Sequence, residues 1–97
     1  MENIVFLEMR SRGYNVWVGD NNGKEIDIVA EKFGKMAYVQ AVYRFTSEEV
    51  VDREFGNLEK IDDYFPKYVV TMDDLTPLGH RGIECVKLKD FLLSDKF

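Results

Sequence analysis

The sequence predicts an α/β domain whose mixed central sheet is flanked by helices. Three strand-like runs, joined by short glycine-containing turns, follow an opening helical stretch and most simply form an antiparallel meander. A capped helix then separates the meander from two further strand-like runs. Because a helix at that place allows a right-handed crossover, the third and fourth strands should pair in parallel. The 97 residues, 45% of them apolar, suit one domain over 1–97 with a single core.

The opening helix is expected over residues 2–12. Its apolar side chains recur with helical spacing, and Glu8 falls inside the same stripe. Arg10 and Arg12 make the last turn basic and Gly13 supplies a left-handed cap, so the helix should stop there. The apolar members of the stripe are Met1, Ile4, Val5 and Met9.

The meander is expected over residues 14–18, 25–31 and 36–45. Turn-forming residues 19–23 connect the first two strands, and a Phe33-Gly34-Lys35 turn connects the second strand to the third. Regular alternation in the second strand places Glu25, Asp27, Val29 and Glu31 on one face, opposite Ile26, Ile28 and Ala30.

The second half of the chain begins with a helix from Thr46 to about Asp63. Thr46 is the expected N-cap and Glu49 completes a capping box. One helix face is apolar, and most of the acidic side chains, Glu54 among them, are expected to face water. The remaining elements are a strand over 67–72, a loop over 73–82, a strand over 83–88 and a short helix over 90–93.

Charge is unevenly distributed along the chain, which has a net charge of −5. Six cationic and six acidic side chains balance within residues 1–45, so the acidic excess lies in the second half. An acidic domain is poorly suited to non-specific phosphate binding, so contact with nucleic acid is expected through the first half. The sequence has neither a membrane-length apolar run nor a signal peptide, and we expect a cytoplasmic protein with no membrane partner.

Three polar side chains are candidates for a site. If the polar faces of the second and third strands match, Asp27 and Gln40 become neighbours, and Glu8 on the packed face of the first helix could join them. Carboxylate and amide oxygens are suitable ligands for Mg²⁺ or Mn²⁺, which could activate a water near a scissile phosphate. The alternative is structural: Glu8 pairs with an arginine, and Asp27 and Gln40 form local hydrogen bonds.

Five runs in the same order give the chain a family resemblance. The runs are ENIVFLEMRSRGY (2–14), GKEIDIVA (23–30), YVQAVY (38–43), REFGNL (53–58) and YFPKYVV (64–70). Together they resemble the carboxy-terminal domain, of unknown function, of a large prokaryotic family of predicted AAA+ superfamily ATPases. The resemblance implies that residue 1 is an internal position, and that ATP binds only in an amino-terminal module outside this chain. These residues contain no Gly-x-x-x-x-Gly-Lys-Ser/Thr loop.

That domain is in turn similar to the PD-(D/E)XK, or restriction-endonuclease-like, nucleases. The resemblance places Asp27 at the metal-binding Asp, Glu8 at the first-helix Glu of some branches, and residues 40–42 at the (D/E)-x-Lys triplet. Gln40 lacks the carboxylate charge, and Val42 lacks the ammonium that would orient the attacking water. Arg44 is the nearest cation, but its guanidinium stays charged and is a poor proton acceptor.

These departures favour a catalytically inactive, nuclease-like module that binds DNA or protein beside the ATPase module of the same polypeptide. One alternative is an active, Mg²⁺- or Mn²⁺-dependent nuclease that uses Glu8, Asp27 and Gln40 as ligands, with Arg44 as a further catalytic candidate. The other alternative is a structural or homo-oligomerisation domain. Exposed aromatic surface near Phe6, Trp17 or Phe45 would support it.

Overall fold

The computed structural model describes residues 1–73 and 82–94, so most of the loop predicted over 73–82 lies outside the described residues. Its helices and strands follow the predicted order, with a five-stranded mixed sheet at the centre. The elements are α1 (Glu2–Ser11), β1 (Asn15–Asn21), β2 (Lys24–Lys32), β3 (Lys35–Val42), α2 (Glu48–Glu59), β4 (Lys67–Thr71), β5 (Glu84–Lys87) and α3 (Leu88–Leu93).

Strand order in the sheet follows the chain, β1-β2-β3-β4-β5. The first three strands are antiparallel, whereas β3, β4 and β5 are parallel. The parallel pairing of β3 with β4 is the one that the intervening helix α2 predicted. Gln40 of β3 lies opposite Val69 of β4, which places Gln40 in the middle of the sheet.

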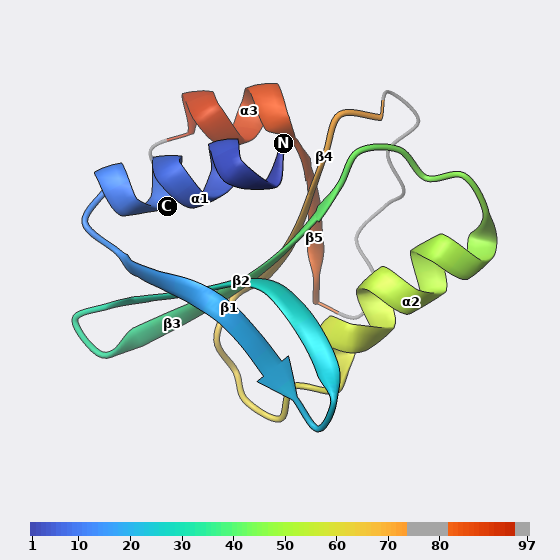
Figure 1. The fold of residues 1–97 in the computed structure, drawn as a ribbon, viewed down its shortest axis with the longest axis horizontal. Helices are drawn as coiled ribbons and strands as arrows, with labels where there is room; N and C mark the ends of the chain where they lie inside the picture. Colours follow the sequence, from blue (N-terminus) through green and yellow to red (C-terminus); the bar gives the residue numbers. More distant parts are fainter. Residues whose placement is uncertain (74–81, 95–97) are drawn as a thin grey trace.

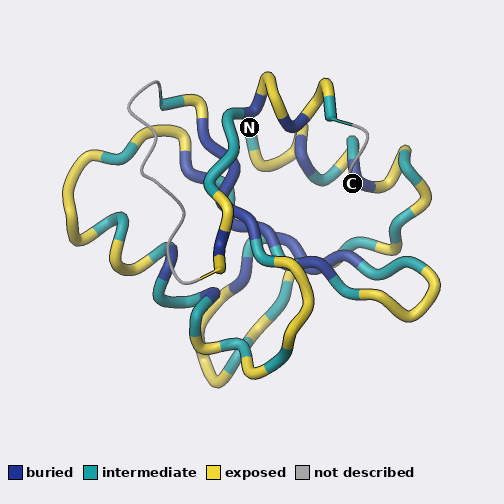
Figure 2. Tube along the Cα trace, turned by 180° about the vertical axis from the view of Figure 1, so that it is seen from behind, coloured by how far each residue is buried: buried dark blue, intermediate teal, exposed yellow. Residues whose placement is uncertain are grey.

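Helices cover both faces of this sheet (Figure 1). Helices α1 and α3 lie side by side on one face, and α2 lies on the other, so the described chain has three layers. Figure 2 shows that buried residues concentrate in the central strands, while the outer side of α2 and the β2–β3 turn are exposed.

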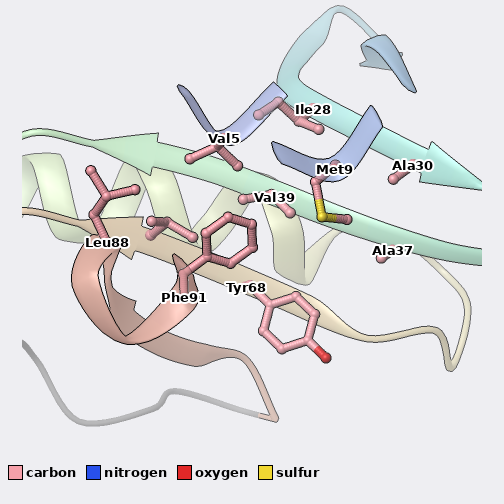
Figure 3. Close-up of a cluster of buried hydrophobic side chains, with 10 residues drawn as sticks. Val5, Met9, Ile28, Ala30, Ala37, Val39, Tyr68, Leu88 and Phe91 are labelled. Atoms are coloured by element: carbon pink, nitrogen blue, oxygen red, sulfur yellow. The ribbon is translucent and has the colours of Figure 1, made fainter. Parts of the chain in front are cut away.

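The core on the α1 and α3 face is drawn in Figure 3. Val5 and Met9 of α1 and Phe91 of α3 are fully buried against side chains from the central strands. Arg12 joins the two helices, because its guanidinium donates to the carbonyl oxygens of Ser94 at 2.7 Å and Leu92 at 3.1 Å at the end of α3. These bonds satisfy carbonyls that a helix terminus leaves without intrahelical partners.

The core on the opposite face is built around α2. Phe55 and Leu58 are buried there with Val42 and Val69. The N-cap of this helix is Ser47 instead of the predicted Thr46: its extended backbone lets the side-chain oxygen accept from the Val50 N–H at 3.3 Å. Both hydroxyl residues can cap, so the sequence alone does not distinguish them.

Two other boundaries differ from the prediction because side chains redirect the backbone. Helix α2 ends at Glu59 and not near Asp63, whose carboxylate instead bonds Tyr38 and Lys67 at the sheet. Strand β3 ends at Val42 and not at Phe45, whose N–H donates to the Asp73 carboxylate at 2.9 Å.

Candidate functional site

Asp27 and Gln40 are neighbours, as expected from their place in the hairpin. The regular β2–β3 pairing extends as far as Ile28 opposite Val39. Beyond that pair, side chains supply the hydrogen bonds between the two strands. The Asp27 N–H donates to Gln40 Oε1 at 2.8 Å, and the Ala41 N–H donates to Asp27 Oδ2 at 2.9 Å. Each side chain therefore binds the backbone of the other strand.

A β-bulge in β2 brings Asp27 to this position. Trp17 pairs with Val29 and Gly19 with Ile26, so β2 contains one residue more than β1 across the same interval. Ile26 consequently packs with Val29 in the α2 core, whereas Ile28 packs in the α1 core. The predicted grouping of Ile26 with Ile28 on one face was wrong, because alternation was assumed to be regular.

The Asp27 carboxyl group is in an unfavourable place for a charge. Burial raises its pKa to about 6, and only the hydrogen bond from the Ala41 N–H lowers it. Glu2, Glu54 and Glu25 raise it further, and every charged side chain of the described segments that shifts this pKa is a carboxylate. Among the described residues, the charged side chains that act on Asp27 therefore all oppose its ionisation.

None of these acids was among the predicted site residues, although Glu25 was expected on the same strand face as Asp27. Glu54 was expected to face mostly water, yet its side chain is only 19% exposed, and burial raises its pKa. A signal for its position was present, since Glu54 lies four residues after Val50 and four before the buried Leu58. No comparable signal in the sequence marks Glu2, which is simply an acidic residue at the start of the first helix.

Glu8 is used elsewhere. Its carboxylate accepts from Arg12 Nε at 2.8 Å, in an i,i+4 ion pair near the end of α1. Arg12 is also bonded to the last turn of α3, so Glu8 helps to orient the link between the two helices. The structure thus gives Glu8 the arginine partner of the structural alternative.

The positions after Gln40 place no amine beside Asp27. Val42 is 6% exposed and packs in the α2 core with Phe55 and Leu58. Arg44 lies beyond the end of β3 and is exposed. A lysine at residue 42 would have to bury its ammonium among apolar side chains.

The three candidate metal ligands already have hydrogen-bond partners within the protein. Glu8 is paired with Arg12, while Asp27 Oδ2 and Gln40 Oε1 each accept a backbone N–H. Within residues 1–73 and 82–94, no group of three or more His, Cys, Asp and Glu side chains is arranged to hold a metal ion. The arrangement stabilises the end of the β2–β3 ladder instead.

A second polar cluster joins the start of β4 to β3. Tyr38 donates its hydroxyl to Asp63 Oδ2 at 2.6 Å, and Lys67 Nζ donates to Asp63 Oδ1 at 2.9 Å. Burial and the Asp63 carboxylate raise the Tyr38 pKa to about 12. Burial opposes ionisation of Asp63, but the bonds from Lys67 and Tyr38 outweigh it and lower the Asp63 pKa. This cluster connects the α2–β4 segment to the sheet.

Comparisons with known proteins give one informative relative. An uncharacterized protein of Haemophilus influenzae is 37% identical over 93 residues, which cover 96% of this chain and 22% of that protein. The chain thus spans about a fifth of the relative's length. No family model matches the chain, and no solved structure matches it. In the described segments, no helix is long and apolar enough to cross a membrane.

Proposed function

We propose that this chain is a non-catalytic binding module with a nuclease-like fold, carried by a longer ATPase polypeptide and contacting DNA or protein. The observation that carries the proposal is the position of Val42. Its side chain fills the α2 core at the place where a nuclease of this kind would use a lysine. A reaction that depends on a lysine ammonium at residue 42 therefore lacks that group.

The hydrogen bonds around Asp27 support the same proposal. Asp27 and Gln40 exchange bonds with the opposite strand, and neither needs a metal ion to satisfy those backbone groups. Losing one well-placed electrostatic group typically lowers a rate by ~10²- to 10³-fold, and here both the lysine and the second carboxylate are missing. The length of the H. influenzae relative fits a domain that occurs within a longer chain.

A cleavage assay on the 97-residue chain tests the proposal. The chain is incubated with supercoiled plasmid, with single-stranded and duplex oligonucleotides, and with a branched junction, in Mg²⁺ or Mn²⁺. We expect no cleavage, and no binding heat when either metal is titrated into the chain at millimolar concentration. Cleavage that persists in the purified chain but disappears in Asp27→Ala would overturn the proposal and favour the metal-dependent nuclease.

A second candidate function, homo-oligomerisation, is favoured by β1. Among the described residues β1 pairs only with β2, so its other edge presents unpaired backbone groups. Trp17 is 43% exposed and Val18 57% exposed on this edge strand, whereas Phe6 and Phe45 pack against the two cores. Strand pairing between two copies would cover this edge.

Light scattering after size-exclusion chromatography tests this second candidate. We expect Val18→Lys to convert a dimer to a monomer, because a charge on an edge strand opposes strand addition. Val18→Thr is the matched control, since threonine keeps the β-branched shape and should keep the dimer. A monomeric wild-type chain at high micromolar concentration would exclude this role.

A further inference from the structure

The turn between β2 and β3 exposes an aromatic side chain at a position that disfavours it. Phe33 has φ +54° and Gly34 has φ +80°, and the Phe33 side chain is 91% exposed. A bulky residue with positive φ is strained, and an exposed phenyl ring gains nothing from burial. Neither the turn nor the core therefore explains Phe33.

The other hairpin of the same sheet provides an internal comparison. Its turn residues Asn22 and Gly23 have φ +55° and +82°, nearly the same pair of values. Asparagine is favoured at the first of these positions because it tolerates the left-handed region. The chain thus uses the favoured residue in one turn and phenylalanine in the other.

A groove of about 290 Å³ lies beside Phe33. Tyr14, Met36, Phe65 and Pro66 contribute apolar and aromatic surface to it. Phe65 is 37% exposed, so a second ring remains partly accessible next to Phe33. A planar apolar group inserted here could contact more than one ring.

Two lysines flank the same turn. Lys32 and Lys35 lie directly opposite each other in the hairpin, an arrangement that like charges disfavour. Lys32 is held in place, since its Nζ donates to the Arg12 carbonyl at 2.8 Å and lies 5.2 Å from the Tyr14 ring centroid. Lys35 is exposed. The nearby Glu31 carboxylate accepts from the Gly34 N–H and from Asn15.

The acidic helix α2 lies away from this turn, where Glu31 is the neighbouring carboxylate. Figure 1 shows the β2–β3 turn projecting at one end, with the acidic helix α2 at the opposite end. Glu48 and Glu49 in the first turn of α2 are therefore remote from Lys32 and Lys35. A negatively charged ligand can reach the turn without passing the acidic helix.

We propose that Lys32–Lys35 and the adjacent groove bind single-stranded nucleic acid, with a base stacked on Phe33 and phosphates near the two lysines. Exposed rings between cations are the arrangement that such ligands require, because unpaired bases offer their faces for stacking. A duplex keeps its bases stacked on one another, so it should bind less well. This inference rests on the proposed binding role and names its ligand.

Fluorescence anisotropy with labelled oligo-dT and oligo-U tests this inference on the 97-residue chain. We expect binding of at least one single strand, and weaker binding of a duplex of equal length. Phe33→Asn should weaken binding roughly tenfold or more, consistent with one lost stacking contact. The same variant should unfold at a higher temperature, because asparagine relieves the strained turn. A loss of binding with a gain of stability excludes misfolding as the cause.

Matched variants distinguish the contribution of base stacking on Phe33 from that of the lysine charges. Phe33→Trp keeps a ring and should bind within about threefold of the wild-type chain. Lys35→Gln should weaken binding and reduce the salt dependence by about one phosphate contact, a slope change of roughly 0.7 for single strands. Lys24→Gln removes an exposed lysine beside the other turn and should leave binding unchanged.

Three results would overturn the inference. One is wild-type affinity in Phe33→Asn, and another is a duplex that binds as tightly as the single strand. The third is a chain that binds no oligonucleotide but forms a dimer that Phe33→Asn disrupts, which would make the turn a protein contact. None of these three results concerns cleavage. The proposed non-catalytic role is therefore tested separately, by the metal-dependent cleavage assay.

Discussion

Gln40 Oε1 accepts the Asp27 N–H at 2.8 Å, while Asp27 Oδ2 accepts the N–H of Ala41, the residue after Gln40, at 2.9 Å. This reciprocal pair continues the bonding of β2 to β3 beyond Ile28 and Val39, where the regular ladder ends. The two residues for which the sequence predicted metal binding here complete the hydrogen bonding of two adjacent strands. Their importance should therefore appear in stability measurements.

Asp27→Asn should stabilise the chain at pH 8. The folded-state pKa of Asp27 is about 6 against an ordinary value of 3.8, so folding favours the protonated form. Its contribution to stability is full below pH 4 and is lost as pH rises through 6. Asparagine keeps an acceptor for the Ala41 N–H without the charge. We expect a gain on the order of 1 kcal/mol at pH 8, discounted for partial exposure, or a rise of roughly 4–8 °C in Tm.

The pH dependence provides the control for this prediction. The stability difference between Asp27→Asn and wild type should shrink from pH 8 to pH 5, because the wild-type carboxyl group takes up its proton. Asp27→Ala should instead lose about 1–3 kcal/mol, since the Ala41 N–H then has no side-chain acceptor. Urea unfolding at both pH values measures these differences. A gap that widens on acidification contradicts the assigned pKa direction.

Gln40→Glu, which places a carboxylate at this predicted site residue, should destabilise the chain. Gln40 is 1% exposed, and a charge at that place would lie beside Asp27 in a buried environment. The loss of stability should be larger at pH 8 than at pH 5, where the new carboxyl group can be neutral. Added Mg²⁺ should not recover it. Recovery of several degrees of Tm by millimolar Mg²⁺ would mean that the pair can form a metal site.

The element order was predictable because each element has a local signal, such as helical periodicity in α1 and glycine-containing turns in the meander. The adjacency of Asp27 and Gln40 also followed from strand alternation and a hairpin. The bulge did not, because nothing in residues 25–31 marks one residue as extra. Glu8 was predicted to join the site because its spacing fits the apolar stripe of the first helix. Spacing alone does not reveal a competing partner such as Arg12.

Tyr38 should ionise at a pH well above the ordinary range for tyrosine. The chain has five tyrosines, and burial with the bond to Asp63 raises the Tyr38 pKa to about 12. Asp63→Asn removes the carboxylate charge, so the late step should move toward 10 while burial keeps part of the shift. Phenolate absorbance against pH follows this change. The late step should be absent in Tyr38→Phe, and its persistence there would assign it to another residue.

Gly19 should not tolerate alanine, because β1 passes very close to β2 next to the bulge. A methyl group at Gly19 would lie 2.3 Å from Val29 Cγ2 and 3.3 Å from Ile26 Cβ. Val29 is 6% exposed, and a β-branched side chain has little rotamer freedom with which to move away. We expect Gly19→Ala to cost about 1–3 kcal/mol in the free energy of unfolding.

A double-mutant cycle with Val29→Ala shows whether this contact is the cause. Val29→Ala removes the methyl groups that Gly19→Ala would strike, although it opens space in the α2 core. The double variant should therefore lose less stability than the sum of the two single losses, by roughly 0.5–3 kcal/mol. Urea unfolding of the four proteins gives the coupling energy. Simple additivity would show that Gly19→Ala acts through the β1 backbone and not through Val29.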